Sequence, residues 1–553
     1  MRKRSRFFRR FLRVITVLVL LIVGLWGYLA WVSNTPPPKI ADTGSLQFQR
    51  NQPDTGIYTI KNSWFRKSNS GLYEMYVEGE PFENGVINGK LSTELVKKQE
   101  DYFAAQITKM IPSKFYLNFL KYFIGWFNRN MPDNVTEEYK DEIYGVSFSA
   151  SEGYNYIGTR YHRIFNYHSA HDIGHALQNM MLVGCTSFGT WNGASADSTL
   201  IIGRNFDFYV GDDFAKNKIV LFNHPSKGYR FMSVTWAGFV GVVSGMNEKG
   251  LTVTINAAKS RFPSGSATPV SLVAREIVQY AGNIQEAIAI AKKRKMFVSE
   301  SFLVGSAIDN KAIVIEKTPD SLAIYDPNQN QILCANHFQS KEFVNTSANK
   351  EQIKESASAY RYSRLQQLLQ KNGTNTVSKT IAILRDFRGK GGADIGLGNE
   401  KALNQFIAHH SIVFEPQKLL VWVSTSPWQM GPFVCYDLKK VFALKGLKEN
   451  KEVYEPGLAI KADSFTNTAQ FESFLRFRDN RQRAADGKKI IADSLVSENP
   501  NYYGSYMAAG DYLYKNKDFK KALGFFRKAL SLEIATEGEK RHIEKMIADC
   551  LKQ

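Results

Sequence analysis

The chain has 553 residues, of which 44% are hydrophobic and 13% aromatic, a composition that suits one large packed domain with appendages and argues against long disorder. The formal net charge is +19, but seven basic residues lie within the first 13 positions with no acid among them, which leaves +12 for the rest. Because nucleic-acid binding needs a concentrated basic footprint, we expect no nucleic-acid partner.

The N-terminal 39 residues predict a membrane anchor. A basic tail (residues 1–13) precedes 19 uncharged residues (14–32), which as a helix would be ~28 Å long and span a hydrocarbon core. The positive-inside rule then places the N-terminus in the cytoplasm and the remainder in an extracytoplasmic space, the periplasm if the source is bacterial. A cleaved signal peptide is the alternative, although the apolar run is long for one and no A-x-A-like site follows. A linker (33–39) with three consecutive prolines forms a stiff spacer.

Two features stand out between this linker and residue 184. The aromatic-rich run at 115–127 contains Asn118 and Lys121 and is too short to span a membrane, so we expect a packing helix; contact with the membrane surface is the alternative. His171 and His175 lie one helical turn apart and could share a metal. However, no third ligand is evident, and H-D-I-G-H lacks the glutamate of H-E-x-x-H, which favours a structural role. We expect no metal and no cofactor.

The stretch from Gly184 to Asp207 predicts a β-hairpin. Two apolar-alternating strands, at 186–191 and 199–203, flank a polar tight connection. Cys185 stands at the entrance, and the far strand returns Arg204 and Asp207 to the same end, because the two ends of a hairpin lie side by side. A thiol, a guanidinium and a carboxylate can therefore meet in one small volume.

The other three cysteines, at positions 334, 435 and 550, show no paired spacing and no C-x-x-C motif, so neither a zinc site nor a dense disulfide framework is indicated. Cys334 and Cys435 both fall in apolar, strand-like runs, which favours buried free thiols. A disulfide between these two is the alternative for an exported domain.

Strands and helices alternate in blocks after the hairpin. We expect short strands within 217–257 and at 302–307, 312–316, 322–325, 331–335 and 408–425, and helices at 270–293, 356–371 and 377–387. Strands grouped in sequence with helices between them indicate the α+β class, with stacked antiparallel sheets covered by helices.

The C-terminal part turns polar, which predicts a linker with helices over 447–494 and a helical hairpin over 495–553. Small and large residues of this hairpin match one tetratricopeptide (TPR) repeat: Gly510, Leu513, Ala522, Phe526 and Ala529. An ordinary helical hairpin fits as well, because such repeats normally stack in groups of about three. We expect the hairpin to dock on the main domain or on a protein partner.

Four motifs together carry a family resemblance. They are G-C-T-S-F…G-R-N-F-D (184–207), S-G-M-N-E-K-G-L (244–251), A-N-H-F (335–338) and S-A-Y-R (358–361). The pattern resembles the N-terminal nucleophile (Ntn) hydrolases, and within them the isopenicillin N acyltransferase-like group of self-cleaving cysteine acyltransferases and amidases, over about residues 135–440. The resemblance implies an αββα four-layer sandwich, with residues 40–184 as a pro-segment or smaller chain and 185–446 as the catalytic domain.

The resemblance also implies roles for individual residues. Self-cleavage would separate Gly184 from Cys185 and free the α-amine of Cys185, whose reference pKa of about 7.7 to 8.0 suits a general base. Asp207 would bind or orient this amine, and Arg204 would hold the substrate carbonyl region or a carboxylate. Asn336 corresponds to the oxyanion-stabilising asparagine, while Arg361 and Asn256 are weaker matches that would line the substrate site.

Five of these residues also have a structural interpretation. Cys185 could be an ordinary buried strand cysteine, and Arg204 with Asp207 a plain salt bridge. Asn336 could cap a turn, and Arg361 could be a solvated helix charge.

The expected function is amide hydrolysis or acyl transfer through a thioester at Cys185, with water or an amine taking the acyl group. An amide-linked lipid, bile-acid-like or peptide-like small molecule is favoured over transfer from coenzyme A, because the domain is expected outside the cytoplasm. A ceramidase- or choloylglycine hydrolase-like amidase is one alternative. An anchored, non-catalytic scaffold that presents the C-terminal hairpin is the other.

Overall fold

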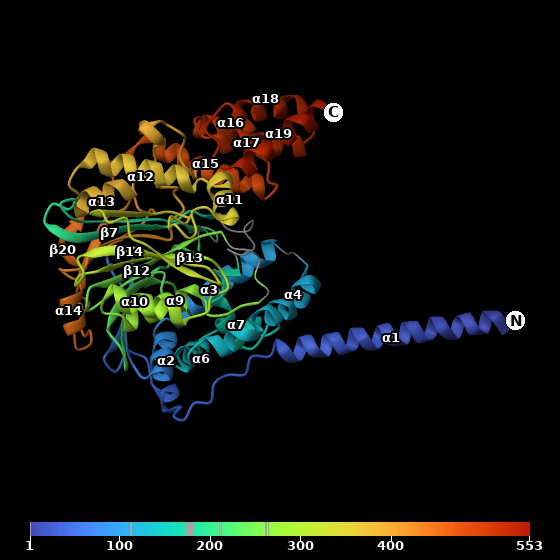
Figure 1. Ribbon diagram of the computed structural model, residues 1–553, viewed down its shortest axis with the longest axis horizontal. Coiled ribbons are helices and arrows are strands. Elements are labelled where there is room, and N and C mark those ends of the chain that lie inside the picture. Colours follow the sequence, from blue (N-terminus) through green and yellow to red (C-terminus); the bar gives the residue numbers. More distant parts are fainter. Residues whose placement is uncertain are drawn as a thin grey trace.

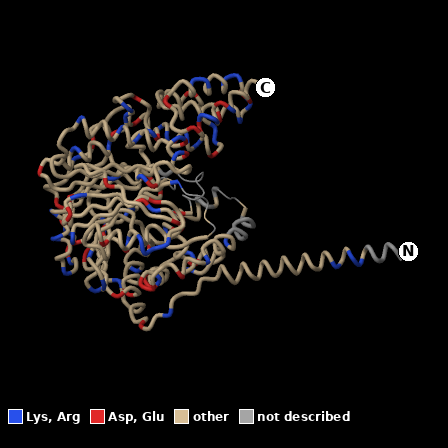
Figure 2. Tube along the Cα trace, viewed as in Figure 1, with Lys and Arg blue, Asp and Glu red and all other residues tan. Residues whose placement is uncertain are grey.

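The computed structural model describes residues 2–110, 113–170, 172–173, 182–209, 211, 213–259, 263 and 265–553. These residues form two large β-sheets and a two-stranded one, together with helices from both halves of the chain. The predicted α+β class is confirmed. Lys and Arg are interspersed with Asp and Glu over the body of the molecule (Figure 2).

The larger sheet joins the N-terminal region to the predicted catalytic domain. Its 11 strands, in spatial order, are β1 (Asn51–Asp54), β2 (Ile57–Ile60), β3 (Ser63–Lys67), β4 (Tyr73–Gly79), β9 (Ile219–Pro225), β10 (Phe231–Thr235), β11 (Ser244–Asn247), β12 (Leu251–Ala257), β13 (Glu300–Ser306), β14 (Lys311–Lys317) and β15 (Leu322–Tyr325). Neighbouring strands are antiparallel except β4 and β9, which pair in parallel. The N-terminal region thus supplies one edge of this sheet.

The smaller sheet carries the hairpin that begins at Cys185. Its seven strands, in spatial order, are β16 (Gln331–Cys334), β6 (Thr186–Asn192), β7 (Ser198–Phe206), β17 (His410–Glu415), β18 (Leu420–Ser424), β19 (Phe433–Asp437) and β20 (Glu455–Ile460). Because β6 and β7 lie next to β16 and β17, the hairpin is enclosed by strands on both sides. Cys334 and Cys435, on β16 and β19, are buried free thiols as predicted.

The two sheets face each other across an apolar layer. Leu200 and Ile202 of β7 pack in one buried cluster with Leu303 and Val314 of the larger sheet. Helices cover the outer faces (Figure 1): α9 (Val270–Tyr280) and α10 (Ile284–Lys293) lie on the larger sheet, and α12 (Ser358–Asn372) and α13 (Val377–Leu384) on the smaller one. The single helix expected at 270–293 is therefore two, separated at Gly282.

The N-terminal region adds a helical subdomain to the β1–β4 edge. Its helices are α2 (Pro81–Leu91), α3 (Thr93–Met110), α4 (Lys114–Phe127), α5 (Met131–Asn134), α6 (Glu137–Ser147) and α7 (Arg160–Tyr167). Helices α2 and α6 pack so closely at Gly85 that no side chain fits there. A Cβ atom on Gly85 would lie 1.9 Å from the Glu142 carbonyl oxygen. Helix α4 forms where the aromatic run predicts one.

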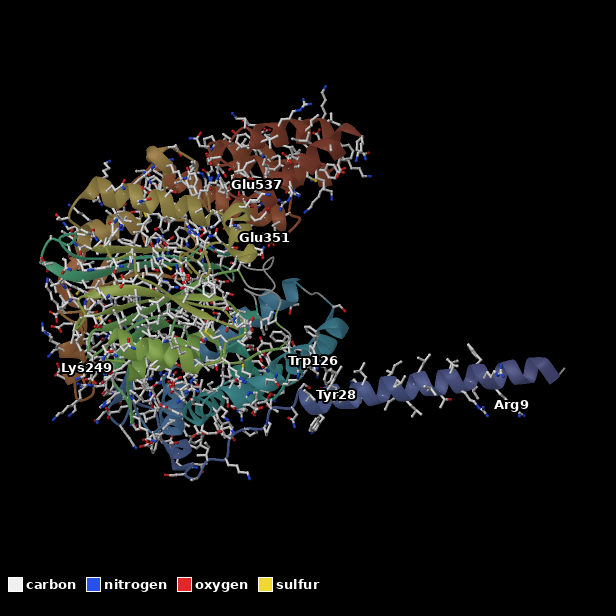
Figure 3. The ribbon with its side chains drawn as sticks, viewed as in Figure 1. Arg9, Tyr28, Trp126, Lys249, Glu351 and Glu537 are labelled. Atoms are coloured by element: carbon white, nitrogen blue, oxygen red, sulfur yellow. The ribbon has the colours of Figure 1, made fainter. Side chains whose placement is uncertain are left out.

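Helix α1 (Arg2–Val32) projects away from the body as one long rod (Figure 1). Within it, Phe8–Val32 has a mean hydropathy of 2.3 and none of it is buried, so its length and composition suit a membrane span or a signal sequence. Arg9 lies near its distal end and Tyr28 near the body (Figure 3). At its base, Trp26 makes an edge-to-face contact with Tyr122 of α4, with ring centroids 6.2 Å apart.

The C-terminal helices dock on the main domain. They are α15 (Ala469–Ala485), α16 (Ala492–Glu498), α17 (Tyr503–Lys515), α18 (Phe519–Leu530) and α19 (Glu537–Leu551). The segment 495–553, expected to form one helical hairpin, contains the end of α16 and three complete helices. Of these, α17 and α18 form a hairpin in which the Asp518 side chain caps the second helix, and α19 packs on α18. Phe406 from the main domain lies in the same buried cluster as Phe474 and Phe526. Whether the hairpin is a TPR-like repeat stays a prediction.

Candidate active site

The β6–β7 hairpin has the register that brings its two ends together. Thr186 pairs with Asn205 and Ser187 with Arg204, so Cys185, one residue before β6, lies beside the end of β7. Before it, β5 (Leu182–Val183) pairs with β8 (Phe208–Tyr209), and the Gly184 backbone N–H donates to the Asp207 carbonyl at 3.0 Å. The residues before and after the Gly184–Cys185 bond are therefore both hydrogen-bonded to the segment that runs from the end of β7 into β8.

The Cys185 thiol contacts the guanidinium of Arg204. Arg204 Nη2 lies 3.7 Å from Cys185 Sγ, and both side chains are buried. The same guanidinium donates to the carbonyls of Val243 and Ile255 and to the hydroxyl of Ser244, the first residue of the S-G-M-N-E-K-G-L motif. Because Arg204 also stacks over Phe206, it is fixed between the two sheets with one N–H group directed at sulfur.

Burial keeps the Cys185 thiol protonated. Desolvation raises the pKa of Cys185 to about 11, because the opposing effect of the Arg204 charge is smaller and the charge of Asp207 raises the pKa further. A thiol with this pKa is a poor nucleophile at neutral pH and needs a base or a transient proton acceptor.

Asp207 is a buried carboxyl group close to this pair. Within the described part of the chain, neither carboxylate oxygen accepts a hydrogen bond. Burial raises the pKa of Asp207 to about 7, although the charges of Arg361 and Arg204 act to lower it. Such an arrangement costs free energy unless a donor arrives. The charges of Arg204 and Asp207 both act on the Cys185 thiol, so the three groups share one buried region.

Asn336 and Arg361 form a second pair beside this group. Arg361 Nη2 donates to Asn336 Oδ1 at 2.6 Å, and Asn336 Nδ2 donates to the Ala257 carbonyl at 2.9 Å. The two motifs also contact each other through Ser358, whose hydroxyl accepts from the Asn336 backbone N–H at 2.7 Å. Arg361 is therefore a buried residue near the site rather than a solvated helix charge.

Asn256 ties the two sheets together. Its Oδ1 accepts from the Ser187 hydroxyl at 2.9 Å, and its Nδ2 donates to the carbonyls of Cys334 and Ala335, both at 3.3 Å. Its amide is thus committed to groups at the start of β6 and the end of β16. The structure places it close to β6, the strand that follows Cys185, but no described hydrogen bond joins it to the Cys185 thiol.

Gln405 is a site residue that sequence reasoning did not find. Gln405 Nε2 donates to the carbonyl oxygen of Gly184 at 2.9 Å. No motif includes position 405, and the two residues lie 221 positions apart in the chain. The only local signal is an amide residue in the short loop that precedes β17.

Other buried titratable groups surround Arg204. His410 Nε2 lies 2.8 Å from Ser244 Oγ, and its Nδ1 lies 2.9 Å from that of His409. Burial lowers the pKa of both histidines well below the usual range, so both are neutral. Burial also raises the pKa of Glu300 well above the usual range, with further raising by Asp172 and a smaller lowering by Arg204. The guanidinium is thus the principal charge beside the thiol.

The described residues do not bring together three or more His, Cys, Asp or Glu side chains that could hold a metal ion. The His171 and His175 pair lies outside the described residues.

Comparisons with known proteins show similarity over part of the chain. Residues 191–424 match the family model of acyl-coenzyme A:6-aminopenicillanic acid acyl-transferase. An uncharacterised protein of Archaeoglobus fulgidus is 26% identical over 274 residues, which cover 46% of this chain and 45% of that protein. Protein dcd1B of Dictyostelium discoideum is 22% identical over 314 residues, which cover 53% and 57%. The chain therefore spans about half the length of the curated relatives it matches.

Two solved structures show partial similarity. One is a Caenorhabditis elegans ortholog of N-acylethanolamine-hydrolyzing acid amidase, at 18% identity and a TM-score of 0.31, covering 42% of this chain and 93% of that one. The other is a mutant of conjugated bile acid hydrolase from Clostridium perfringens, at 12% identity and a TM-score of 0.33, covering 50% and 97%. The family match bears out the resemblance that the motifs carry: residues 191–424 of this chain are similar to the acyl-coenzyme A:6-aminopenicillanic acid acyl-transferase family.

Proposed function

We propose that the protein is a membrane-anchored amide hydrolase or acyltransferase that uses Cys185 as its nucleophile and matures by cutting itself between Gly184 and Cys185. The observation that carries this proposal is the Cys185–Arg204–Asp207 group: a buried thiol 3.7 Å from a fixed guanidinium, beside a buried carboxylate that has no hydrogen-bond donor in the described chain.

Self-cleavage would give the Asp207 carboxylate a hydrogen-bond donor. The Cys185 sulfur attacks the Gly184 carbonyl carbon, the peptide C–N bond breaks, and the thiol proton passes to the departing nitrogen. This gives a thioester and a free α-amine at residue 185. Water then hydrolyses the thioester, which leaves a Gly184 carboxylate and a free thiol. Once protonated, the new amine can donate to the Asp207 carboxylate.

Turnover would reuse the same sulfur with the new amine as its base. The amine accepts the thiol proton, the sulfur attacks the substrate carbonyl, and the leaving amine takes up a proton as the amide bond breaks. Water or an acceptor amine then takes the acyl group from the thioester. Asn336 is the proposed oxyanion donor, while Asn256 and Arg361 shape the substrate site. The substrate class that we favour is an amide-linked lipid, bile-acid-like or peptide-like small molecule.

The proposal includes an architecture. The two sheets and their outer helices would form an αββα four-layer sandwich over residues 185–446, with residues 40–184 as the small chain. Residues 14–32 would anchor the protein as an uncleaved single span, and the C-terminal hairpin would offer a TPR-like surface to a partner. The exposed apolar helix supports the membrane anchor, and the helices that cover both sheets support the four-layer sandwich.

Intact-mass spectrometry of the purified full chain tests maturation. We expect a fragment that begins at Cys185, and a single uncut chain for Cys185→Ala, which should fold with a melting temperature close to that of the wild type. Cys334→Ala is the matched control, because Cys334 is also a buried thiol and its variant should cut normally. An uncut wild-type chain would favour the scaffold alternative, and a cut Cys185→Ala chain would exclude Cys185 as the nucleophile.

A further inference from the structure

Gln405 approaches the bond at which the proposed self-cleavage occurs. Its Nε2 donates to the Gly184 carbonyl oxygen at 2.9 Å, and the side chain is 2% exposed. The approach is close: a Cβ on Gly184 would lie 2.3 Å from Gln405 Nε2 and 2.7 Å from Oε1. Since real Cβ contacts do not reach this distance, only glycine at position 184 allows the amide to take this place.

The loop that carries Gln405 is held by several independent contacts. Asn404 Oδ1 accepts from the Phe406 backbone N–H at 3.0 Å, and Phe406 adopts a positive φ of 54°. The Phe406 ring lies 4.9 Å from that of Phe474 on α15, and Arg478 Nη1 donates to the Phe406 carbonyl at 3.3 Å. The Gln405 amide is therefore positioned by both the main domain and the C-terminal helices.

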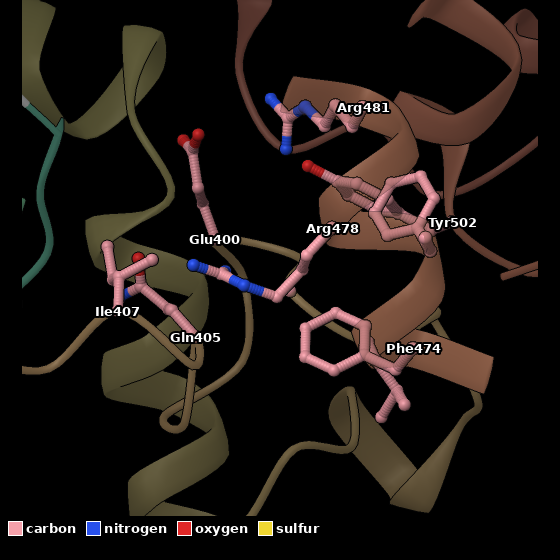
Figure 4. A pocket seen from close by; sticks show the side chains of 10 residues that line it. Glu400, Gln405, Ile407, Phe474, Arg478, Arg481 and Tyr502 are labelled. Atoms are coloured by element: carbon pink, nitrogen blue, oxygen red, sulfur yellow. The ribbon is translucent and has the colours of Figure 1, made fainter. Parts of the chain in front are cut away.

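A recess borders this loop on the side of α15. Gln405 and Ile407 lie on one wall, and Phe474 and Arg478 lie on the other (Figure 4). Its empty space is about 410 Å³, including a part that is open to solvent. The amide that binds the Gly184 carbonyl thus stands between the buried nucleophile and a solvent-accessible recess.

We propose that Gln405 is the oxyanion donor for self-cleavage, distinct from the donor used in turnover. This inference rests on the proposed function, since it assumes that Cys185 attacks the Gly184 carbonyl. When the sulfur adds, the carbonyl oxygen gains negative charge while the Gln405 N–H already points at it. The charged oxygen accepts a stronger hydrogen bond than the neutral carbonyl does, so the contact stabilises the tetrahedral species more than the ground state.

The other two amides are directed elsewhere in the uncut chain. Asn336 Nδ2 donates to the Ala257 carbonyl, and Asn256 Nδ2 donates to those of Cys334 and Ala335. Gln405 is the side chain with a described hydrogen bond to the Gly184 oxygen. Collapse of the tetrahedral species then breaks the Gly184–Cys185 bond, and the hydrogen bond from Gln405 passes to the thioester oxygen.

The test compares the rates of self-cleavage and of turnover. Gln405→Leu keeps the side-chain volume and removes the donor. Its matched control is Gln429→Leu, because Gln429 is also fully buried and donates to a backbone carbonyl, that of Leu384 at 3.4 Å. Each full chain is made by pulse-labelled synthesis with membranes, and the fragment that begins at Cys185 is quantified over time.

We expect Gln405→Leu to slow self-cleavage about 100-fold, the usual effect of losing one oxyanion donor, and Gln429→Leu to change it less than about threefold. Turnover per cut molecule should stay within about threefold of the wild type in both variants. Cleavage of Gln405→Leu at the wild-type rate would overturn the inference. So would a parallel fall in cleavage, turnover and melting temperature, because that pattern indicates a structural role. A wild-type chain that never cuts would instead refute the proposed function itself.

Gly184→Ala provides a second readout. The alanine methyl group would displace the Gln405 amide, so Gly184→Ala alone should slow self-cleavage. Added to Gln405→Leu, it should slow self-cleavage by less than about a further threefold. Additive effects of the two substitutions would contradict a shared hydrogen bond.

Discussion

Arg204 Nη2 lies 3.7 Å from the sulfur of Cys185, and every other described contact of this guanidinium fixes its position between the two sheets. The contact joins a residue at the end of β7 to the residue just before β6, as the hairpin register requires. A buried positive charge at this distance favours the thiolate over the thiol. Arg204 is thus placed to make Cys185 reactive once a base is present.

Arg204→Lys should lower turnover about 10- to 100-fold, because a lysine keeps one charge but cannot donate to sulfur, carbonyls and Ser244 together. The measurement is kcat/KM on an amide that the wild type hydrolyses. Arg275→Lys is the matched control, since Arg275 is equally buried and pairs with Glu142 at 3.0 Å away from the thiol. We expect the control to lose stability with turnover per folded molecule intact. Equal losses of turnover in both variants would contradict the role of Arg204.

The pH dependence of stability should report the buried Asp207 carboxyl group in the uncut Cys185→Ala chain. Its folded-state pKa is raised to about 7 by burial, so the folded state holds the proton more tightly than the unfolded state does. Its contribution to stability is present below the unfolded pKa of about 3.9 and is lost as the pH rises towards 7. Between about pH 5 and pH 8, the loss should be roughly 3 kcal/mol.

Asp207→Asn in the same Cys185→Ala background should remove most of this loss, as measured by urea unfolding at both pH values. Asp197→Asn is the control. The Lys418 side chain holds the pKa of Asp197 at about 2, so its contribution is constant above about pH 5 and is lost only in acid. An unchanged pH dependence after Asp207→Asn would show that Asp207 ionises normally.

The hairpin could be predicted because its signals are local. Alternating apolar residues define β6 and β7, and the returning strand brings Arg204 to Cys185 without any knowledge of the rest of the fold. The positions of most later strands along the chain were predictable for the same reason, although β19 and β20 were not predicted. The contact between the A-N-H-F and S-A-Y-R motifs, through Ser358 and Asn336, depends on how helix α12 docks and has no local signal.

The strands β1–β4 were missed because charged residues interrupt their apolar pattern. Arg66 and Glu74 are 1% and 0% exposed and lie 3.5 Å apart, and Glu74 accepts from the Tyr436 hydroxyl at 2.9 Å. The hydrogen-bond partner of this buried ion pair lies 362 positions away in the chain. From the sequence alone, the two charged residues therefore indicate an exposed polar segment. Gln405 was missed for the same physical reason, since its partner Gly184 is distant in the chain.

The C-terminal hairpin offers two glycines with opposite expected effects. A Cβ on Gly510 of α17 would lie 2.7 Å from the Phe526 ring of α18, whereas Gly524 has open space around it. Gly510→Ala should therefore lower stability by about 1 to 3 kcal/mol through overpacking, and Gly524→Ala should raise it by up to about 1 kcal/mol through helix propensity. Thermal unfolding of both variants measures this. Equal effects would show that α17 and α18 do not pack as described.

Membrane orientation can be measured by protease accessibility. If residues 14–32 form an uncleaved span with the basic tail inside, protease added to the outside of intact cells or spheroplasts should digest the catalytic domain and spare a cytoplasmic marker protein. Replacing the seven basic residues before Val14 with serine should weaken this orientation, whereas seven Lys→Ser changes within 488–552 should not. Full protection of the catalytic domain would reverse the proposed topology.

Asn336→Ala separates turnover from maturation. As the proposed oxyanion donor for external substrates, Asn336 should act on charge that develops in the transition state, so its loss should lower kcat about 100-fold and leave KM nearly unchanged. Because Asn336 Nδ2 donates to the Ala257 carbonyl in the uncut chain while Gln405 binds Gly184, self-cleavage should slow far less than turnover. Both rates are measured on the same preparation, together with its melting temperature.

The matched control is Asn349→Ala. Asn349 is also buried, and its amide donates to the carbonyl of Phe338, the last residue of the A-N-H-F motif, at 2.9 Å. Its loss should reduce stability through the same kind of broken hydrogen bond without lowering kcat per folded molecule. If Asn336→Ala behaves like this control, the asparagine is a structural residue that holds Arg361, and the oxyanion donor for turnover must be sought among the remaining amides, with Asn256 first because it lies between the start of β6 and the end of β16.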